Sequence, residues 1–489
     1  MYICAFRAYS RQERFKQLLD SIYMKNIGLI FIACMISNTF FGQEITGQWN
    51  GLLKVPGSQL RLVFNVNKTD TGYISTMDSP DQGAKGIQAS MTSFQNSVLK
   101  IEVAVAGIRY EGALTQDNQI VGEFRQSTFS APLVLTRTIP VKEKVVRPQD
   151  PVEPYPYYSE EVKFTNPKDN AILAGTLTLP AKDGKYPVVV LISGSGPQNR
   201  NEELMGHKPF LVLADFLTRN GIGVLRYDDR GTAASTGDFS KATTPILATD
   251  VEAAISYLLT RKEIDKKKIG LIGHSEGGII APMVAARCKN VHYIVLLAGT
   301  GIPGSELLLM QQELIGKASG FTAEKLANNK SINKGAFDIL VNATNEESMK
   351  KDLKDYMLKV TAEAPANEKP AGVSDEDIVN QQVGQLTSPW FEYFLKYDPS
   401  QILQKVKCPV LALNGGKDLQ VPPRENLSAI KLNLLKGGNK NVTVREYPNL
   451  NHLFQECKTG LPIEYGEIQQ TMSPQVLNEI VSWIKNETE

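Results

Sequence analysis

The chain has 489 residues, of which 42% are hydrophobic and 21% charged, and its formal net charge is +1. The composition is that of an ordinary globular protein. The length exceeds the size at which one hydrophobic core keeps growing, so we expect two folded units and an appendage. Basic residues are scattered, and the densest basic run, Lys266 to Lys268, precedes a predicted strand as a solvated turn. These features exclude a protein built around a polyanionic partner, and we expect no nucleic-acid binding.

The N-terminal segment, residues 1–43, differs from the rest of the chain. From Met24 onward, a lysine leads into an apolar run, residues 27–41, which is followed by a small residue, Gly42. This pattern predicts a secretory signal peptide, and its apolar run is too short for a comfortable membrane span. We therefore expect a secreted or periplasmic protein that starts at Met24 and keeps no stable membrane span after processing. An uncleaved anchor and a membrane-anchored lipoprotein processed at Cys34 stay open as alternatives.

Cysteines and histidines are too few for a disulfide framework or a metal site. The chain contains five cysteines and four histidines. Three cysteines follow the expected signal peptide, Cys288, Cys408 and Cys457, and an odd, sparse set does not predict disulfide pairing. No Cys-x-x-Cys or His-x-x-x-His spacing is present, so we expect no required metal.

Residues 44–138 predict an all-β unit. Apolar and polar residues alternate in Ser58–Asn67 and again in Leu99–Val105, which is the period of a strand with one buried face. Turn residues separate these runs and no helical pattern occurs among them, so we expect a small barrel or sandwich. The start Gly47-Gln48-Trp49 is similar to the Gly-x-Trp start of lipocalin-like barrels. The unit serves either as a binding module or as a packing domain.

Residues 139–158 contain five prolines among charged residues, a composition typical of an extended linker. Beyond it, residues 159–489 alternate strand patterns with amphipathic helices, which predicts a mainly parallel, doubly wound α/β sheet. Several strand patterns are continuous apolar runs, as strands buried on both faces must be. Eight strands are predicted: Val162–Thr165, Leu173–Leu179, Pro187–Ser193, Gly223–Tyr227, Lys268–Gly273, Tyr293–Ala298, Val410–Asn414 and Val442–Tyr447. Residues 302–407, between the sixth and seventh strands, have helical periodicity and predict a helical cap.

The sharpest local pattern is Gly-x-Ser-x-Gly at residues 273–277, between a predicted strand and a helix that starts near Gly277. So tight a turn from strand to helix needs small residues beside the serine, and it leaves the serine Oγ exposed above the sheet. The adjoining helix N-terminus favours developing negative charge. We therefore predict that Ser275 is a catalytic nucleophile.

A serine nucleophile needs a base and an acid that orients the base, and after this kind of turn the chain order is serine, acid, histidine. His452 is the only histidine that follows both Ser275 and Asp418. Asp418 stands just past a predicted strand in a Gly-Gly-Lys-Asp turn, where its carboxylate can hold the imidazole in the required tautomer. These three residues are our predicted triad. Glu425 and Glu456 are rival acids that we expect to be solvated. We expect the other three histidines to be surface or supporting residues: His207, His274 and His292.

A carbonyl substrate also needs backbone donors for its developing oxyanion. The first is the N–H of Glu276, the residue after the nucleophile. The second is expected in the loop Ser193–Gln198 after the third predicted strand, where two glycines permit close approach to a substrate. Ser195 is our first choice for this donor, and Gly196 is the alternative. The nearby charged run, Asp228 to Arg230, is expected to pin this loop by charge-assisted hydrogen bonds.

Five motifs follow one another along the chain: residues 191–197, residues 226–231, the Gly-x-Ser-x-Gly turn, the Gly-Gly-Lys-Asp turn and the Asn-His loop. Together they resemble the α/β-hydrolases of the serine aminopeptidase and acyl-esterase type, over about residues 160–487. The resemblance implies the α/β-hydrolase fold and cleavage of carboxylic esters, or less often of short peptides, through an acyl-enzyme without a cofactor. Two positions depart from the family pattern, Ser193 in place of a histidine and Ala233 in place of a glycine.

The cap is expected to decide substrate choice. An aromatic cluster just before the seventh strand either lines an acyl pocket or forms the cap's own core; its members are Trp390, Phe391, Tyr393 and Phe394. Our first hypothesis is a serine esterase for short to medium acyl groups, with a small-molecule ester as substrate. The alternative is a serine aminopeptidase or short-peptide hydrolase, which needs acidic residues for a free amino terminus, such as Glu306, Glu313 and Glu392. The third hypothesis is an inactive binding scaffold with a hydrolase domain.

Overall fold

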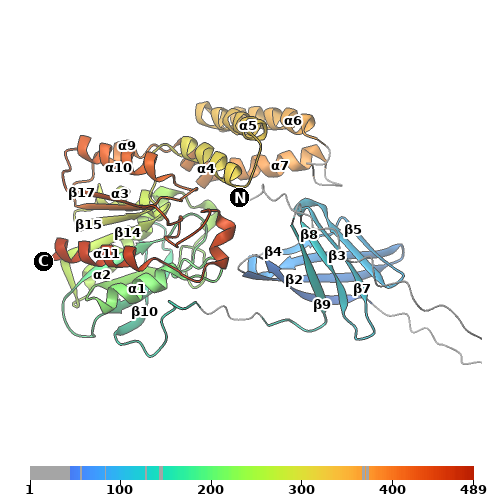
Figure 1. Ribbon diagram of the computed structural model, residues 1–489, viewed down its shortest axis with the longest axis horizontal. Coiled ribbons are helices and arrows are strands. Elements are labelled where there is room, and N and C mark those ends of the chain that lie inside the picture. Colours follow the sequence, from blue (N-terminus) through green and yellow to red (C-terminus); the bar gives the residue numbers. More distant parts are fainter. Residues whose placement is uncertain are drawn as a thin grey trace, which may run out of the picture. The chain divides into compact units, whose positions relative to one another are not determined.

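The structure, a computed structural model, describes residues 45–55, 58–82, 84–126, 129–141, 147–365, 369 and 374–489. The expected signal peptide and the start at Met24 lie outside these residues. The described chain forms two compact units. One contains a nine-stranded sheet, and the other contains an eight-stranded sheet with the α-helices (Figure 1). None of the helices in this part of the chain is long and apolar enough to cross a membrane.

The first unit is a nine-stranded antiparallel sheet with strand order β4-β3-β2-β1-β9-β8-β7-β6-β5. Its strands are β1 Gly47–Val55, β2 Ser58–Thr69, β3 Gly72–Ser79, β4 Ala84–Gln88, β5 Met91–Gln95, β6 Val98–Val103, β7 Ile108–Leu114, β8 Ile120–Gln126 and β9 Phe129–Thr136. Residues along β7 are alternately buried and exposed, as in a sheet with one buried face. The hydroxyl groups of Ser75 on β3 and Thr92 on β5 lie 2.7 Å apart, so the sheet curls back on itself. The predicted small all-β domain is confirmed.

This unit has its own hydrophobic core. The Tyr110 hydroxyl inside it donates to the carbonyl oxygens of Ile120 and Leu133, at 3.0 and 3.1 Å, which satisfies a polar group that would otherwise be costly to bury. Large aromatic side chains less than 3% exposed fill the core: Trp49, Phe64, Tyr110 and Phe124.

The second unit contains an eight-stranded sheet with strand order β10-β11-β13-β12-β14-β15-β16-β17. Its strands are β10 Tyr158–Thr165, β11 Ile172–Leu179, β12 Tyr186–Ile192, β13 Gly223–Tyr227, β14 Ile264–His274, β15 Tyr293–Leu297, β16 Val410–Gly415 and β17 Val442–Tyr447. The strands from β13 to β17 pair in parallel, whereas β10 and β11 are antiparallel to their neighbours. All eight predicted strands are confirmed, although β10 begins at Tyr158 rather than Val162 and β14 at Ile264 rather than Lys268. The sheet is that of an α/β-hydrolase.

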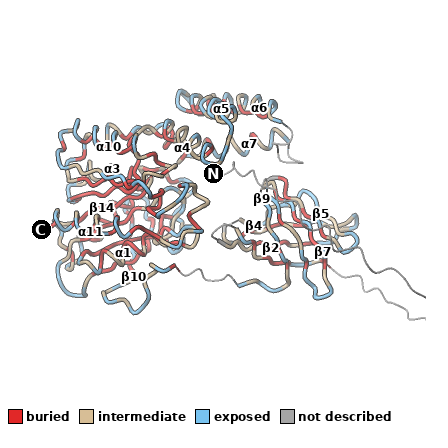
Figure 2. Tube along the Cα trace, viewed as in Figure 1, coloured by how far each residue is buried: buried red, intermediate tan, exposed pale blue. Residues whose placement is uncertain are grey.

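Helices cover both faces of this sheet (Figure 1). In β12, alternate residues Val188 and Val190 pack with α2, α3 and α10, whereas Val189 and Leu191 pack with α1 and α11. A strand buried on both faces shows no polar side, which explains the continuous apolar run in its sequence. Figure 2 shows this burial, with the central strands in red. The covering helices are α1 Pro209–Arg219, α2 Thr244–Thr260, α3 Gly277–Ala285, α10 Pro423–Lys436 and α11 Pro474–Thr488.

The cap lies between β15 and β16 in the chain. Its helices are α4 Gly304–Ala318, α5 Ala323–Asn342, α6 Glu346–Glu363, α7 Asp375–Leu386, α8 Pro389–Lys396 and α9 Ser400–Leu403. Polar N-cap residues start α5, α6, α7 and α8, and each of their side chains accepts a backbone N–H from the first turn. The cap has an apolar core of its own, in which Phe337, Leu353 and Phe391 take part. The predicted helical cap is therefore confirmed.

The second half of the Pro-rich segment is bound to the hydrolase unit. Arg147 is 3% exposed, and its guanidinium donates to the carbonyl oxygens of Met205, Gly466 and Ile468. Gln149 binds the chain just before α11. Since three carbonyl groups hold one guanidinium, the chain from Arg147 onward is fixed rather than freely extended, a feature that its composition did not predict.

His207 lies buried near Arg147, with its ring nitrogens 2.9 Å from the Thr471 hydroxyl and 3.0 Å from the Tyr465 carbonyl oxygen. Burial, and then the charge of Arg147, lower the pKa of His207 from 6.5 to about 4. The unfolded chain thus binds a proton that the folded chain does not. The stability contribution of His207 is complete above about pH 6.5 and is lost as the pH falls to about 4.

We expect His207→Gln to weaken the pH dependence of the free energy of unfolding between about pH 7 and pH 4. The difference from the wild type should reach about 3 kcal/mol. Urea titrations at several pH values measure it, with the exposed His292→Gln variant as the matched control. Identical pH profiles for His207→Gln and the wild type would show that His207 is not held neutral.

Candidate active site

Ser275 occupies the turn between β14 and α3. Its φ is 53°, a left-handed conformation that non-glycine residues adopt mostly at strained functional turns. Its N–H donates to the Leu297 carbonyl oxygen on β15 at 2.9 Å. Gly277 permits the close packing, because a Cβ at this position would lie 2.2 Å from the carbonyl oxygen of Ile192. The strand, the strained serine and the helix of the predicted nucleophile turn are thus all formed.

Asp418 and His452 are brought together from two loops. The Nδ1 atom of His452 donates to Asp418 Oδ2 at 2.7 Å, and both residues are less than 5% exposed. The other oxygen of Asp418 accepts the N–H groups of Gln420 and Val421, at 2.8 and 2.9 Å. A proton held on Nδ1 leaves Nε2 of His452 free to accept one, which is the tautomer that a general base needs.

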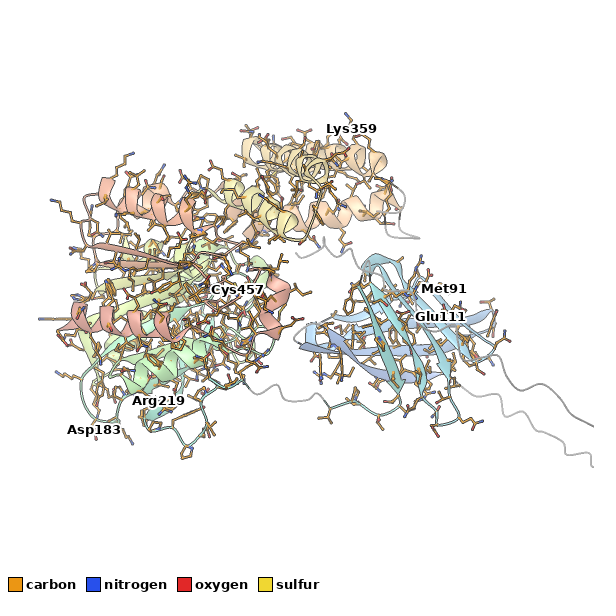
Figure 3. The ribbon with its side chains drawn as sticks, viewed as in Figure 1. Met91, Glu111, Asp183, Arg219, Lys359 and Cys457 are labelled. Carbon is orange, nitrogen blue, oxygen red and sulfur yellow. The ribbon has the colours of Figure 1, made fainter. Side chains whose placement is uncertain are left out.

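Glycine at the end of β16 lets these loops meet. A Cβ on Gly415 would lie 2.3 Å from the carbonyl oxygen of Leu450, so a larger residue would push the histidine loop away from Asp418. Asn451 stiffens that loop, since its Oδ1 accepts the N–H groups of Leu453 and Gln455. Cys457, which lies farther along the chain (Figure 3), forms no disulfide in the described chain. The rival acids lie elsewhere. Glu425 is half-buried on α10 and Glu456 is exposed, and in the described chain neither makes a hydrogen bond to His452.

His452 lies directly beside the nucleophile turn. Its carbonyl oxygen is 3.1 Å from His274 Nε2, and the two imidazole centroids are 4.8 Å apart. Within the described chain, no hydrogen bond joins the Ser275 hydroxyl to His452. In substrate-free serine hydrolases this contact is commonly long and tightens when substrate binds.

The loop after β12 lies against Ser275. A Cβ on Gly194 would be 3.2 Å from the Ser275 Cβ. The Gly194 N–H donates to Glu202 Oε1 at 2.7 Å, so it is not available to a substrate. The N–H groups of Ser195 and Glu276 donate to no group in the described chain, which leaves both for an oxyanion.

Asp229 braces this loop at both ends. Its carboxyl group accepts the Ser193 hydroxyl at 3.0 Å and the Gln198 N–H at 2.9 Å. Ser193, which stands where the family usually has a histidine, is therefore itself anchored. Burial, helped by the charges of Glu276 and Glu202, raises the pKa of Asp229 to about 8 despite these hydrogen bonds. Its neighbours in the charged run pair with other partners: Asp228 with Arg200, and Arg230 with Asp250.

The aromatic cluster of α8 divides between two roles. Phe391 packs on Phe337 in the cap core, and Phe394 stacks on Trp390 at 5.3 Å within the larger hydrolase core. The Trp390 indole N–H donates to both carboxylate oxygens of Glu276, at 2.8 and 2.9 Å. The cap is thereby tied to Glu276, the residue that follows Ser275.

We expect Trp390→Phe to lower the free energy of unfolding by about 1–3 kcal/mol, because in the described part of the chain it leaves the Thr244 hydroxyl as the one remaining side-chain donor to the buried carboxyl of Glu276. Burial already raises the pKa of Glu276, against the hydrogen bonds from Thr244 and Trp390. Denaturant titration measures the loss. The control is a double-mutant cycle with Glu276→Gln, in which the Trp390 substitution should cost less. Equal costs in both backgrounds would mean that lost packing, not the hydrogen bond, explains the effect.

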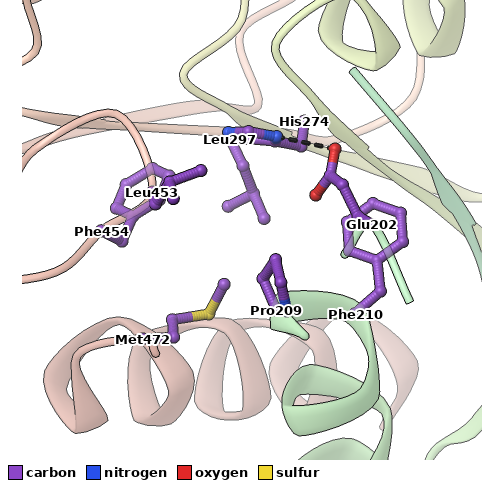
Figure 4. Close-up of a pocket in the computed structure, with 8 residues that line it drawn as sticks. All are labelled: Glu202, Pro209, Phe210, His274, Leu297, Leu453, Phe454 and Met472. Carbon is purple, nitrogen blue, oxygen red and sulfur yellow. Dashed lines mark hydrogen bonds and ion pairs between the residues drawn. The ribbon is translucent and has the colours of Figure 1, made fainter. Parts of the chain in front are cut away.

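Glu202 and His274 are residues that the sequence did not assign to the site. His274 Nδ1 and Glu202 Oε1 are 2.9 Å apart, and both line a small, largely apolar cavity (Figure 4). The cavity has room for roughly one water. The adjacency of His274 to the nucleophile was the one signal in the sequence. Nothing linked it to Glu202.

The chain has recognisable relatives. The family model for X-Pro dipeptidyl-peptidases (S15 family) matches residues 169–430. The esterase EstD of Thermotoga maritima is 25% identical over 313 residues, which are 64% of this chain and 65% of EstD, slightly less than two thirds of its length. A putative carboxymethylenebutenolidase of Synechocystis sp. is 28% identical over 145 residues, which are 28% of this chain and 58% of that protein.

Solved structures of similar chains include an esterase and a protein with bound ferulic acid. The Pyrococcus furiosus esterase Pf2001 has a TM-score of 0.40 at 15% identity and covers 68% of this chain and 93% of its own. Est1E from Butyrivibrio proteoclasticus has a TM-score of 0.38 at 16% identity and covers 67% of this chain and 97% of its own. Because the family model spans more than half of the chain, the chain belongs to the X-Pro dipeptidyl-peptidase (S15) family, on the α/β-hydrolase fold.

Proposed function

We propose that the protein is a serine hydrolase that cleaves carboxylic esters with short to medium acyl groups. The observation that carries the proposal is the 2.7 Å hydrogen bond between His452 Nδ1 and Asp418, formed beside the strained turn of Ser275. A buried carboxylate that orients an imidazole next to a serine is the arrangement that activates a hydroxyl nucleophile.

In the proposed reaction, Ser275 Oγ attacks the ester carbonyl carbon while His452 Nε2 takes the hydroxyl proton. The negative charge that develops on the carbonyl oxygen is stabilised by the N–H groups of Glu276 and Ser195, with Gly196 as the alternative second donor. Collapse breaks the ester C–O bond, and His452 gives its proton to the departing alcohol. A water then loses a proton to His452 and attacks the acyl carbon, which releases the carboxylic acid and returns the proton to Ser275.

The peptidase alternative is favoured by the description of the family, X-Pro dipeptidyl-peptidase. A peptidase that acts from a free amino terminus needs an unpaired acidic group near the nucleophile. Of the three cap acids considered for this role, Glu313 forms an ion pair with Lys330 and Glu392 with Lys396, and these pairs support the ester hypothesis. Glu306, exposed in the first turn of α4, forms no ion pair in the described chain and is the acid that the peptidase alternative keeps. A small-molecule ester is therefore our first substrate class, and a short peptide the second.

The test is a substrate panel for the mature protein. It compares p-nitrophenyl esters from acetate to decanoate with p-nitroanilides of single amino acids and of X-Pro dipeptides. Faster turnover of esters would support the proposal, and the best chain length would size the acyl pocket. Faster turnover of anilides would replace it with the peptidase alternative. Absence of turnover and of fluorophosphonate labelling would leave the inactive scaffold.

A further inference from the structure

Glu202 and His274 connect three parts of the site. Glu202 Oε1 is 2.7 Å from the backbone nitrogen of Gly194 and 2.9 Å from His274 Nδ1. His274 Nε2 is 3.1 Å from the carbonyl oxygen of His452. The loop after β12, the nucleophile turn and the histidine loop thus share one continuous set of hydrogen bonds, part of which is drawn in Figure 4.

The partners of His274 fix how many protons it carries. A backbone carbonyl oxygen can only accept a hydrogen bond, and so can an ionised carboxylate. Glu202 Oε1 already accepts the Gly194 N–H, as an acceptor-only oxygen does. With Glu202 ionised, both ring nitrogens of His274 donate and the ring is an imidazolium. A neutral ring beside an ionised Glu202 would leave two acceptors facing each other at Nδ1.

The surroundings make this pair costly to break. Glu202 is 5% exposed and His274 is 7% exposed. The cavity beside them has an apolar wall of Pro209, Phe210, Leu297, Leu453, Phe454 and Met472. Removing one partner of a buried charge pair leaves the other charge buried and uncompensated, which is strongly destabilising. Glu202 also has a φ of 51°, a strained backbone of the kind that persists when surrounding contacts hold it.

We propose that Glu202 and His274 are positioning residues of the active site, in which an imidazolium at His274 fixes the histidine loop and the carboxylate of Glu202 fixes the oxyanion loop. The proposal rests on the function proposed for Ser275, Asp418 and His452. In this proposal Asp418 orients the imidazole of His452, whereas Glu202 and His274 hold the two backbone segments on either side of Ser275.

The charged groups around His274 agree with this geometry. The titratable groups that face it are Glu202 before α1, Asp418 after β16 and His452 after β17. Burial acts to lower the pKa of His274. The charge and hydrogen bond of Glu202, the His452 carbonyl and the charge of Asp418 outweigh burial, so the pKa is raised.

Nuclear magnetic resonance tests the protonation state without any substrate. The chain has four histidines, so ¹⁵N-histidine labelling gives few imidazole signals, and the signals of His274 are those lost in a His274→Gln variant. In the wild type at about pH 8, where an ordinary histidine is neutral, we expect protons on both ring nitrogens of His274. In Glu202→Gln, which removes the counter-charge, we expect a proton on only one.

Kinetics test the positioning role. Glu202→Gln should lower kcat for the best ester by about tenfold to a hundredfold with little change in KM, since displaced catalytic groups slow the chemical step. The matched control is Glu203→Gln, which makes the same change at the exposed neighbouring residue. The kcat/KM of Glu202→Gln divided by that of Glu203→Gln should fall as the pH rises. The reason is that His274 loses its proton at a lower pH in Glu202→Gln than in the variant that keeps Glu202.

The outcomes separate this proposal from the proposed function. A neutral His274 in the wild type, or an unchanged proton count in Glu202→Gln, would overturn it even if the enzyme is active. Equal, pH-independent kinetics of the two variants would also overturn it. Two ring protons that depend on Glu202, in a protein that turns over neither esters nor anilides, would uphold the imidazolium and reject the proposed function. If Glu202→Gln does not fold, the wild-type spectrum still decides the protonation state.

Discussion

Ser275→Ala is expected to lower kcat for ester hydrolysis by about 10⁶-fold, because it removes the atom that forms the acyl-enzyme. Substrate binding should persist, since the cap and the backbone N–H groups of Ser195 and Glu276 stay in place. Steady-state assays on the best p-nitrophenyl ester measure kcat. The amide analogue of that ester measures affinity: its inhibition constant for the wild type is compared with its dissociation constant for the Ser275→Ala variant.

Ser256→Ala is the matched control for this substitution, because Ser256 is an exposed serine on α2. It should keep the wild-type rate and react with a fluorophosphonate, whereas Ser275→Ala should not react. Labelling of Ser275→Ala at the wild-type rate would place the nucleophile on another serine and remove the basis of the mechanism.

Asp418→Asn is expected to lower kcat by about 10⁴-fold at neutral pH, with a much smaller effect on KM. An asparagine amide that faces Nδ1 of His452 donates a hydrogen bond where the carboxylate accepted one. The imidazole proton then moves to Nε2, the atom that must take the proton from Ser275. The geometry of the loop should survive, since the asparagine oxygen can still accept the N–H groups of Gln420 and Val421, as Asp418 does.

Glu425→Gln is the informative control, because Glu425 is the rival acid nearest to Asp418 in the chain. It should leave kcat unchanged. A large loss in Glu425→Gln together with a small one in Asp418→Asn would mean that the orienting acid had been misassigned.

The sequence determined the architecture of the hydrolase unit because several of its strands are buried on both faces. Such strands must be continuous apolar runs, as in β12 and β15. The alternation of strand patterns with helices placed the remaining strands, including β13 and the partly exposed β17 at the predicted bounds. The nucleophile turn was equally visible, since its glycines are demanded by contacts with Ile192 and other backbone atoms. The order of Ser275, Asp418 and His452 along the chain then left one histidine to choose.

Only the tertiary structure decided which polar groups meet across long separations in the chain. Glu202 lies 72 residues before His274, and Trp390 lies 114 residues after Glu276; no local pattern links either pair. The same holds for Arg147, which is bound to carbonyl groups of loops more than 300 residues away. Apolar periodicity is written locally, because each element must present one face to a core. A buried hydrogen bond depends on the direction of two side chains from different elements, and that direction exists only once the elements have packed.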